Sequence, residues 1–147
     1  MKENYNMAQN QRLVIGISGA SGAVLGIRLL EACRKLDLET HLVISKAGEI
    51  TIAQETNRSV SEVRALASHT HKSADIGAAI ASGSYPTMGM AVVPCSIRTM
   101  SEIATGVTSS LLTRAADVTL KERRKLILAI RETPLHTGHL RSLTQLS

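Results

Sequence analysis

The chain has 147 residues, of which 44% are hydrophobic and 20% charged, and its formal net charge at pH 7 is +5. This length suits a single domain with a buried core, and no apolar stretch is long enough to cross a bilayer. The first eleven residues lack the apolar segment of a secretion signal, so we expect neither a membrane protein nor a secreted one. We expect residues 1–11 to form a disordered tail and residues 12–147 to form one domain.

The composition also argues against nucleic-acid binding. Tyr5 and Tyr85 are the only aromatic residues apart from histidine, which leaves no platform on which bases could stack. The densest basic run, residues 121–125, fits a solvated helix end better than a nucleic-acid patch. The two cysteines, Cys33 and Cys95, do not suggest a disulfide framework, which fits a reducing cytoplasm.

The most informative stretch is residues 12–23, RLVIGISGASGA. The apolar run at 13–18 predicts a buried parallel strand, and the amphipathic pattern at 21–36 predicts a helix directly after it. Small residues between them would let a ligand approach the free N–H groups of the first helical turn, which suits a nucleotide or flavin phosphate. The glycine spacing matches neither the dinucleotide fingerprint nor the P-loop, so a plain strand–helix turn remains an alternative.

The rest of the chain alternates the same two patterns. Further buried strands are predicted at residues 40–44, 88–93 and 125–130. Helices are predicted at residues 46–55, after a cap at Ser59 or Ser61, and at 98–104, 110–123 and 137–146. Residues 69–85 fit no clear pattern, and 75–81 could be helical or extended.

Alternating strands and helices predict a three-layer, Rossmann-like α/β fold, with a parallel sheet covered by helices on both faces. Ligands of such sheets bind beyond the carboxyl ends of the strands. We therefore expect four polar strand ends to meet in one crevice: Ser18–Ser21, Ser45–Lys46, Pro94–Ser96 and Arg131–Glu132.

Several segments also carry a resemblance to a known family. They are residues 16–23, 39–46, 55–56, 82–84, 94–99, 112–118, 120–124 and 131–135. In sequence and order they resemble the UbiX/Pad1-type flavin prenyltransferases, flavoproteins once called 3-octaprenyl-4-hydroxybenzoate carboxy-lyases. The resemblance implies transfer of a dimethylallyl group from its phosphate or pyrophosphate to N5 and C6 of reduced FMN. It further implies delivery of prenylated FMN to a UbiD-type decarboxylase, a homo-oligomer with active sites at subunit interfaces, and no metal.

The resemblance assigns roles to individual residues. Those matching FMN-binding positions are Gly19, Ala20, Ser21, Ser45, Ser96, Ile97, Arg98, Thr99 and Arg131. Glu55, Glu132 and Lys121 match groups implicated in the chemistry, and Arg114 and Lys121 match cations that contact the dimethylallyl phosphate or support the interface. The roles are chemically reasonable, because cations stabilise a departing phosphate and a carboxylate can accept the proton lost from the flavin.

The chain departs from the family pattern at its end. Members continue with another strand, a tyrosine-bearing loop and a basic C-terminal helix, whereas this sequence stops at Ser147. We therefore expect an unpaired sheet edge, and a truncated non-catalytic FMN-binding or assembly subunit is an alternative function. A flavin-dependent cysteine decarboxylase is a third possibility, but those enzymes carry Pro-Ala-Ser-Ala-Asn-Thr where this chain has residues 94–99, PCSIRT.

Other reactive side chains receive ordinary interpretations. The pairs His69/His71 and His136/His139 lack cysteine or carboxylate partners at usual metal-ligand spacing, so we expect surface or capping histidines. Cys95 has no neighbouring base in the sequence and is expected to be a small buried residue, not a nucleophile. Tyr85 could either contact a ligand or fill the core.

Overall fold

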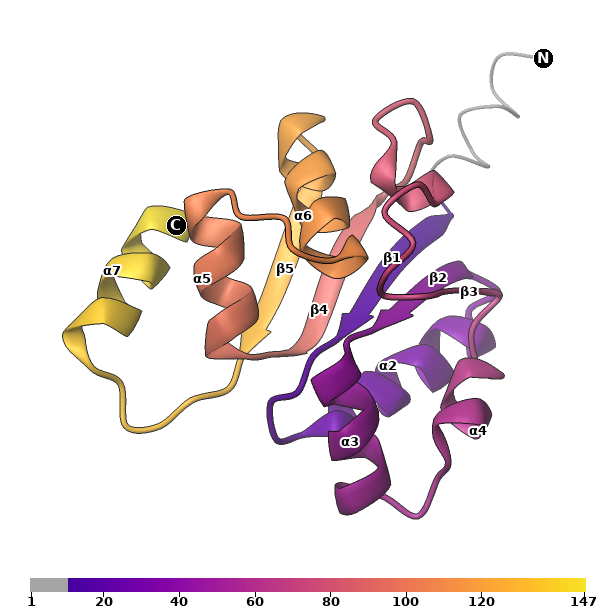
Figure 1. Cartoon of the computed structure of the whole chain (residues 1–147). Helices are drawn as coiled ribbons and strands as arrows, with labels where there is room; N and C mark the ends of the chain where they lie inside the picture. The colour runs from indigo at the N-terminus through magenta and orange to yellow at the C-terminus, as the bar shows by residue number, and fades with distance from the viewer. Residues whose placement is uncertain (1–10) are drawn as a thin grey trace.

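The computed structural model describes residues 11–147, so the tail predicted at residues 1–11 lies, apart from Gln11, outside the described residues. Five strands form one sheet in the order β3-β2-β1-β4-β5, and every neighbouring pair is parallel (Figure 1). The strands are β1 Arg12–Ile17, β2 Glu39–Ile44, β3 His69–His71, β4 Gly89–Cys95 and β5 Lys125–Ile130. The predicted parallel α/β sheet is confirmed.

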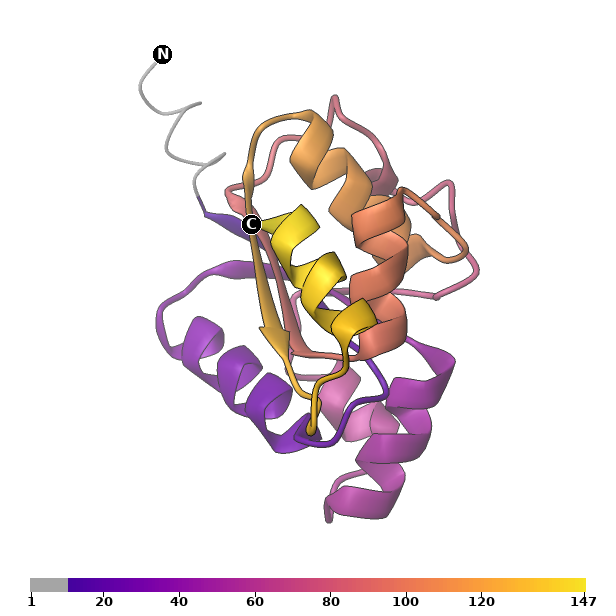
Figure 2. The same ribbon diagram turned by 90° about the vertical axis from the view of Figure 1, so that its left-hand side faces the viewer.

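Helices cover both faces of the sheet, as Figure 2 shows edge-on. One face carries α2 Ala23–Lys35, α3 Lys46–Glu55 and α4 Val60–Arg64, and the other carries the short 3-10 helix η1 Ala79–Ala81, α5 Ile97–Thr105 and α6 Leu111–Lys121. The last helix, α7 Thr137–Leu146, packs beside α5.

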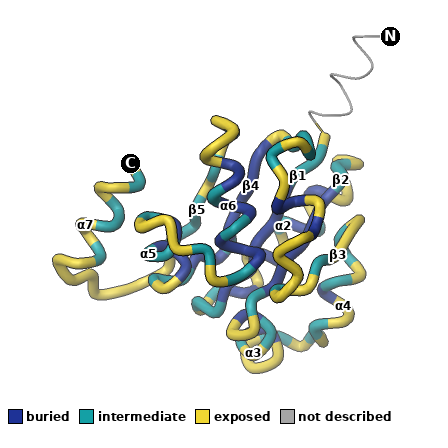
Figure 3. Tube along the Cα trace, turned by 45° about the horizontal axis from the view of Figure 1, so that its top comes forward, coloured by how far each residue is buried: buried dark blue, intermediate teal, exposed yellow. Residues whose placement is uncertain are grey.

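Alternating side chains of the central strand build two separate cores. Val14 faces the cluster that includes Leu112 and Met100, whereas Ile15 and Ile17 face the cluster beneath α2 and α3. This alternation is the ordinary period of a strand, and the central strands β1, β2 and β4 are largely buried as a result (Figure 3).

Two expectations from the sequence need correction. The sequence predicts a buried strand at 125–130, but β5 is an outer strand and Ile127 is 55% exposed, because no helix of residues 11–147 covers that part of the sheet on one face. Residues 69–85 contain β3 and η1, joined mainly by turns, and β3 was not predicted.

Within residues 11–147 we find no helix with both the length and the hydropathy that a bilayer crossing requires.

Gly26 lets α2 lie directly on the sheet. A Cβ at this position would come within 2.3 Å of the Val93 carbonyl oxygen and 3.0 Å of the Ile17 side chain. We expect Gly26→Ala to destabilise the fold by roughly 1–3 kcal/mol, because overpacking outweighs the gain in helix propensity of about 1 kcal/mol. Urea unfolding measures this change. In the control Gly77→Ala the nearest atom is 3.8 Å away, and equal unfolding midpoints in the two variants would contradict the prediction.

Candidate functional site

A cleft of about 460 Å³ opens beyond the carboxyl ends of the strands. Residues that directly follow β1, β2, β3 and β4 contribute to it, so distant parts of the sequence meet there. Its lining consists of Gly19, Ser45, Lys46, Ala47, Ser73, Ala74, Ser96, Arg98, Thr99, Glu102, Ser109, Ser110 and Leu112. Three of the four predicted strand ends therefore converge, but the end of β5 does not line this cleft.

Ser18 joins the ends of the two central strands. Its hydroxyl is buried, donates to the Pro94 carbonyl at 2.7 Å and accepts from the Ser96 N–H at 2.8 Å. The next residue, Gly19, lies against α3, where a Cβ would be 2.5 Å from that of Ala47. A small residue is therefore required at this wall of the cleft.

Two helices begin at the cleft, and a serine caps each of them. Ser45 accepts the Gly48 N–H of α3 at 3.0 Å, and Ser96 accepts the Thr99 N–H of α5 at 3.2 Å. Both helices point the positive ends of their dipoles toward the cleft. Their first turns also carry Lys46 and Arg98, whose charges oppose the helix dipole and suit an anionic ligand. Glu49 in the first turn of α3 and Glu102, 4.0 Å from Arg98, offset part of this positive charge.

Glu55 occupies the start of α2. One carboxylate oxygen accepts the N–H groups of Gly22 at 3.0 Å and of Ala23 at 3.4 Å. The Gly22 N–H, helped by the Ser21 hydroxyl and by the charge of Arg131, holds the pKa of Glu55 below its ordinary value. In this structure the N–H groups of Gly22 and Ala23 are therefore bound by a carboxylate of the chain itself, and the expectation of a phosphate at this turn stays a prediction.

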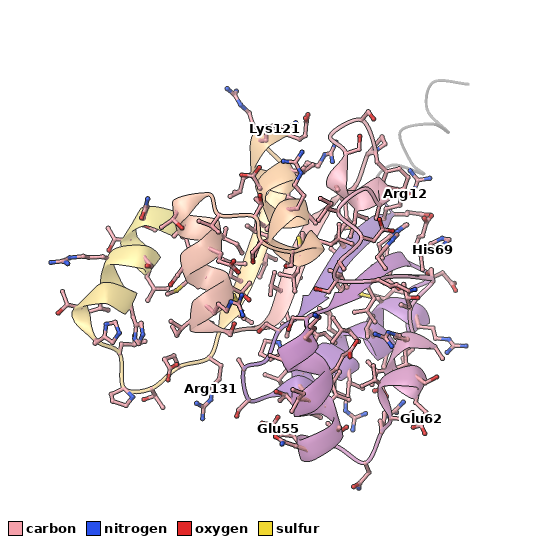
Figure 4. All side chains as sticks on the ribbon, viewed as in Figure 1. Arg12, Glu55, Glu62, His69, Lys121 and Arg131 are labelled. Atoms are coloured by element: carbon pink, nitrogen blue, oxygen red, sulfur yellow. The ribbon has the colours of Figure 1, made fainter. Side chains whose placement is uncertain are left out.

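Several predicted site residues lie outside the cleft. Figure 4 shows Glu55 and Arg131 at one edge of the molecule and Lys121 at the far end of α6. Lys121 is exposed, with its ammonium 3.6 Å from the Glu122 carboxylate. The cleft lining also excludes Ala20, Ser21, Ile97, Arg114 and Glu132.

These residues have other contacts in a single chain. Ile97 packs against the core beneath α6, and the Arg114 guanidinium lies 3.8 Å from the Asp117 carboxylate. The Arg131 N–H donates to the Cys95 carbonyl at 3.1 Å, and the exposed Glu132 carboxylate accepts the Thr133 N–H at 3.0 Å. Of the predicted FMN-binding residues, the cleft brings together Gly19, Ser45, Ser96, Arg98 and Thr99.

The sequence reasoning did not assign site roles to three serines. Ser73 follows β3, and its carbonyl accepts the Leu111 N–H at 2.9 Å, which closes one side of the cleft. Ser109 and Ser110 precede α6 and line the same side. For Ser73 the only signal in the sequence is a polar residue after a strand, and that strand was not predicted; Ser109 and Ser110 lie between two helices and carry no such signal.

Cys95 and one histidine pair match their ordinary interpretations. Burial raises the pKa of Cys95 to about 12, so the thiol is protonated at neutral pH and is not a ready nucleophile. His136 is the N-cap of α7 and exchanges hydrogen bonds with His139, which confirms a capping role.

Fold and cleft together define a doubly wound α/β protein with a cleft at the carboxyl edge of its sheet, where two helices begin. The Flavoprotein family model matches residues 1–145. The UbiX flavin prenyltransferases of Salmonella typhimurium and Escherichia coli K12 are 60% and 58% identical to the chain over 136 residues, which is 92% of the chain and 72% of each relative. The chain belongs to the flavoprotein family and, within it, to the UbiX flavin prenyltransferases, so the resemblance drawn from the motifs is confirmed.

Solved structures agree with this assignment. The crystal structure of AnUbiX (PadA1) with FMN and dimethylallyl pyrophosphate has a TM-score of 0.92 and 49% identity, and the match covers 93% of this chain and 73% of that one. A dodecameric FMN-dependent UbiX-like decarboxylase from E. coli O157:H7 has a TM-score of 0.91 and 49% identity, over 92% of this chain and 74% of that one.

The hydroxyl of Ser18 is expected to stabilise the cleft measurably. Ser18→Ala would leave the buried Ser96 N–H and Pro94 carbonyl without this partner, at a cost of about 1–3 kcal/mol in the free energy of unfolding. Urea unfolding measures the loss. The control Ser84→Ala removes an exposed hydroxyl that also forms a side-chain hydrogen bond, and an equal loss there would contradict a special role for Ser18.

The carboxylate of Glu55 is expected to make the stability of the fold depend on pH in the acidic range. Because its pKa is lower in the folded chain than in the unfolded one, Glu55 stabilises the fold above its unfolded pKa of about 4.3. That contribution is lost as the pH falls through the folded value. NMR titration of the Glu55 carboxyl carbon should give a lower midpoint than the same residue in a peptide of residues 52–58, and identical midpoints would contradict the helix contact.

Proposed function

We propose that this chain is a flavin prenyltransferase. It joins the dimethylallyl group of dimethylallyl phosphate or pyrophosphate to reduced FMN, and the prenylated FMN serves a UbiD-type decarboxylase in the cytoplasm. One observation carries the proposal: two capped helix N-termini and two cations face one cleft, in a fold that matches a relative solved with FMN and dimethylallyl pyrophosphate.

The cleft fits a phosphorylated ligand of this kind. Its volume of about 460 Å³ lies within the range of roughly 300–1,000 Å³ typical of small-molecule sites. The starts of α3 and α5, together with Lys46 and Arg98, suit phosphate oxygens, while Leu112 supplies an apolar wall. Gly19 packs so closely on Ala47 that no side chain fits at position 19.

Prenyl transfer breaks the carbon–oxygen bond to the phosphate and forms bonds to N5 and C6 of reduced FMN. The flavin loses one proton from N5 and one from C6; an alkene carbon of the prenyl group takes up one of them, and the other is released with the phosphate. In this proposal Arg131 binds FMN, Glu55 and Glu132 are the carboxylates available for proton transfer, and Lys121 and Arg114 stabilise the leaving phosphate. None of these five side chains lines the cleft of a single chain.

In a homo-oligomer, Lys121 of one copy could contribute to the cleft of another copy. The residue lies at the end of α6 remote from the cleft, so it can act on bound substrate only in the cleft of another copy. The UbiX-like decarboxylase of E. coli O157:H7, to which this fold is similar, is a dodecamer. We therefore propose that Lys121, with Arg114 on the same helix, contributes to an active site between subunits.

The position of the predicted catalytic residues outside the cleft also favours a second function. Five of the nine predicted FMN-binding residues meet in the cleft of one chain, whereas the predicted catalytic residues Glu55, Glu132 and Lys121 do not line it. A chain that binds FMN or assists assembly without transferring a prenyl group would need only the first set.

The two functions differ in one assay. The purified chain is mixed anaerobically with reduced FMN and dimethylallyl phosphate, and the flavin is then analysed by mass spectrometry. Prenylated flavin supports the transferase. Bound but unmodified FMN favours the binding subunit, and a chain that never binds FMN contradicts both.

Lys46 should strengthen FMN binding through its charge. We expect Lys46→Gln to weaken FMN binding about tenfold, the loss typical of one charge-assisted contact. Fluorescence titration of the flavin measures the affinity. Lys35→Gln removes an exposed charge from the last turn of α2, remote from the cleft, and should leave the affinity unchanged. Equal effects in the two variants would contradict an FMN phosphate at this end of the cleft.

A further inference from the structure

A cluster of three histidines and a glutamate lies outside the cleft, on the two strands at one side of the sheet. Glu39 and His41 belong to β2, and His69 and His71 belong to β3. His41 pairs with His69 in the parallel register, and residues two apart in a strand share a face. The pairing therefore directs all four side chains to the same side of the sheet. We call these four residues the histidine cluster.

Three donor atoms of the cluster converge on one point. The Nε2 atom of His41 is 2.8 Å from Oε1 of Glu39, and Nε2 of His69 is 3.5 Å from the same oxygen. One donor atom from each of these three residues lies within 4.8 Å of the other two. Donors on one tetrahedral zinc ion with bonds of about 2.0–2.1 Å are separated by roughly 3.3 Å, so only small shifts would admit an ion.

The remaining nitrogen of His41 is held as a metal ligand requires. In the free chain Nε2 of His41 carries an N–H that donates to the Glu39 carboxylate at 2.8 Å, and a bound ion would replace that proton. Nδ1 lies 3.0 Å from Nε2 of His71, so the remaining N–H can sit on Nδ1 and donate there once the ion is bound. Stacking against His69, with ring centroids 4.6 Å apart, further fixes its orientation.

We propose that Glu39, His41 and His69 form a binding site for a divalent transition-metal ion of the zinc class. Two imidazole nitrogens and one carboxylate oxygen are a known zinc ligand set that leaves a fourth position open. The hydroxyl of Tyr85, 3.2 Å from Nε2 of His41, lies close enough to contact a water in that position. His69 has a 56% exposed side chain, so the ion can enter from solvent without unfolding (Figure 4).

Arg12 is the group that opposes metal binding. Its Nε donates to Oε1 of Glu39 at 3.2 Å, and its guanidinium lies over the Tyr85 ring. An incoming cation must displace this contact and overcome the repulsion of a neighbouring positive charge. The same carboxylate oxygen thus holds Arg12 in the free chain and the ion in the bound chain.

The bound ion would tie β3 to the sheet. This strand has three residues, and β2 is its only neighbour in the sheet of residues 11–147. Ser73, two residues beyond β3, lines the cleft described above. The site is separate from the proposed prenyl transfer, and it would stabilise a wall of that cleft without taking part in the chemistry.

Zinc titration of the metal-free chain, prepared without a histidine tag and competed against a chromogenic chelator, tests the proposal. We expect one Zn²⁺ per chain. His69→Gln removes an exposed ligand and should weaken binding by about 100-fold or more, since loss of even an outer-shell partner costs roughly 10–100-fold. His139→Gln alters a histidine of the capping pair of α7 and should leave the affinity unchanged.

The variant Arg12→Gln should change the zinc affinity in the opposite direction to His69→Gln. It removes the competing cation and should tighten zinc binding, a result that loss of structure would not produce. Added Zn²⁺ should also raise the thermal unfolding midpoint of the wild-type chain but not that of His69→Gln. The proposal is overturned if the wild-type chain binds no zinc saturably, if His69→Gln binds it as tightly, or if Arg12→Gln binds it more weakly.

Discussion

The parallel ladder of β2, β1 and β4 is the constraint on which the site depends, because it brings the carboxyl ends of these strands to one edge. Ser18 then fixes two of those ends against each other through its contacts with Pro94 and Ser96. Once these ends are joined, α3 and α5 must both begin beside the same cleft. The binding geometry thus follows from strand order and one buried hydroxyl.

The helix starts at this edge divide into two groups. The start of α2 is already neutralised by the carboxylate of Glu55, so its positive end needs no ligand. The starts of α3 and α5 instead carry Lys46 and Arg98, with Glu49 in the first turn of α3 and Glu102 4.0 Å from Arg98. In the proposed function, an anionic ligand in the cleft would lie at these two helix starts and not at the start of α2.

Much of the fold could be predicted because local sequence and tertiary position agree. Ser45 and Ser96 end an extended run and cap the next helix, and Gly106 ends α5 in a left-handed conformation, all within a few residues. The short strand β3 could not be predicted, because its His-Thr-His sequence has no apolar run and it exists only by pairing with β2. The motif also gives no sign that Lys121 lies far from the cleft of its own chain. A sequence motif identifies a residue but does not say to which subunit's cleft that residue contributes.

The histidine cluster also could not be predicted from spacing along the chain, because strand pairing assembles it. Spacing along the chain gave His69 and His71 no carboxylate partner, yet the register of β2 and β3 places Glu39 beside them. Because β3 is so short, its attachment depends on these side chains as well as on the backbone ladder. The segment that leaves β3 continues to Ser73, whose carbonyl binds the start of α6 at the cleft. Contacts at the histidine cluster therefore help to determine where one wall of the cleft lies, although the two sites share no residue.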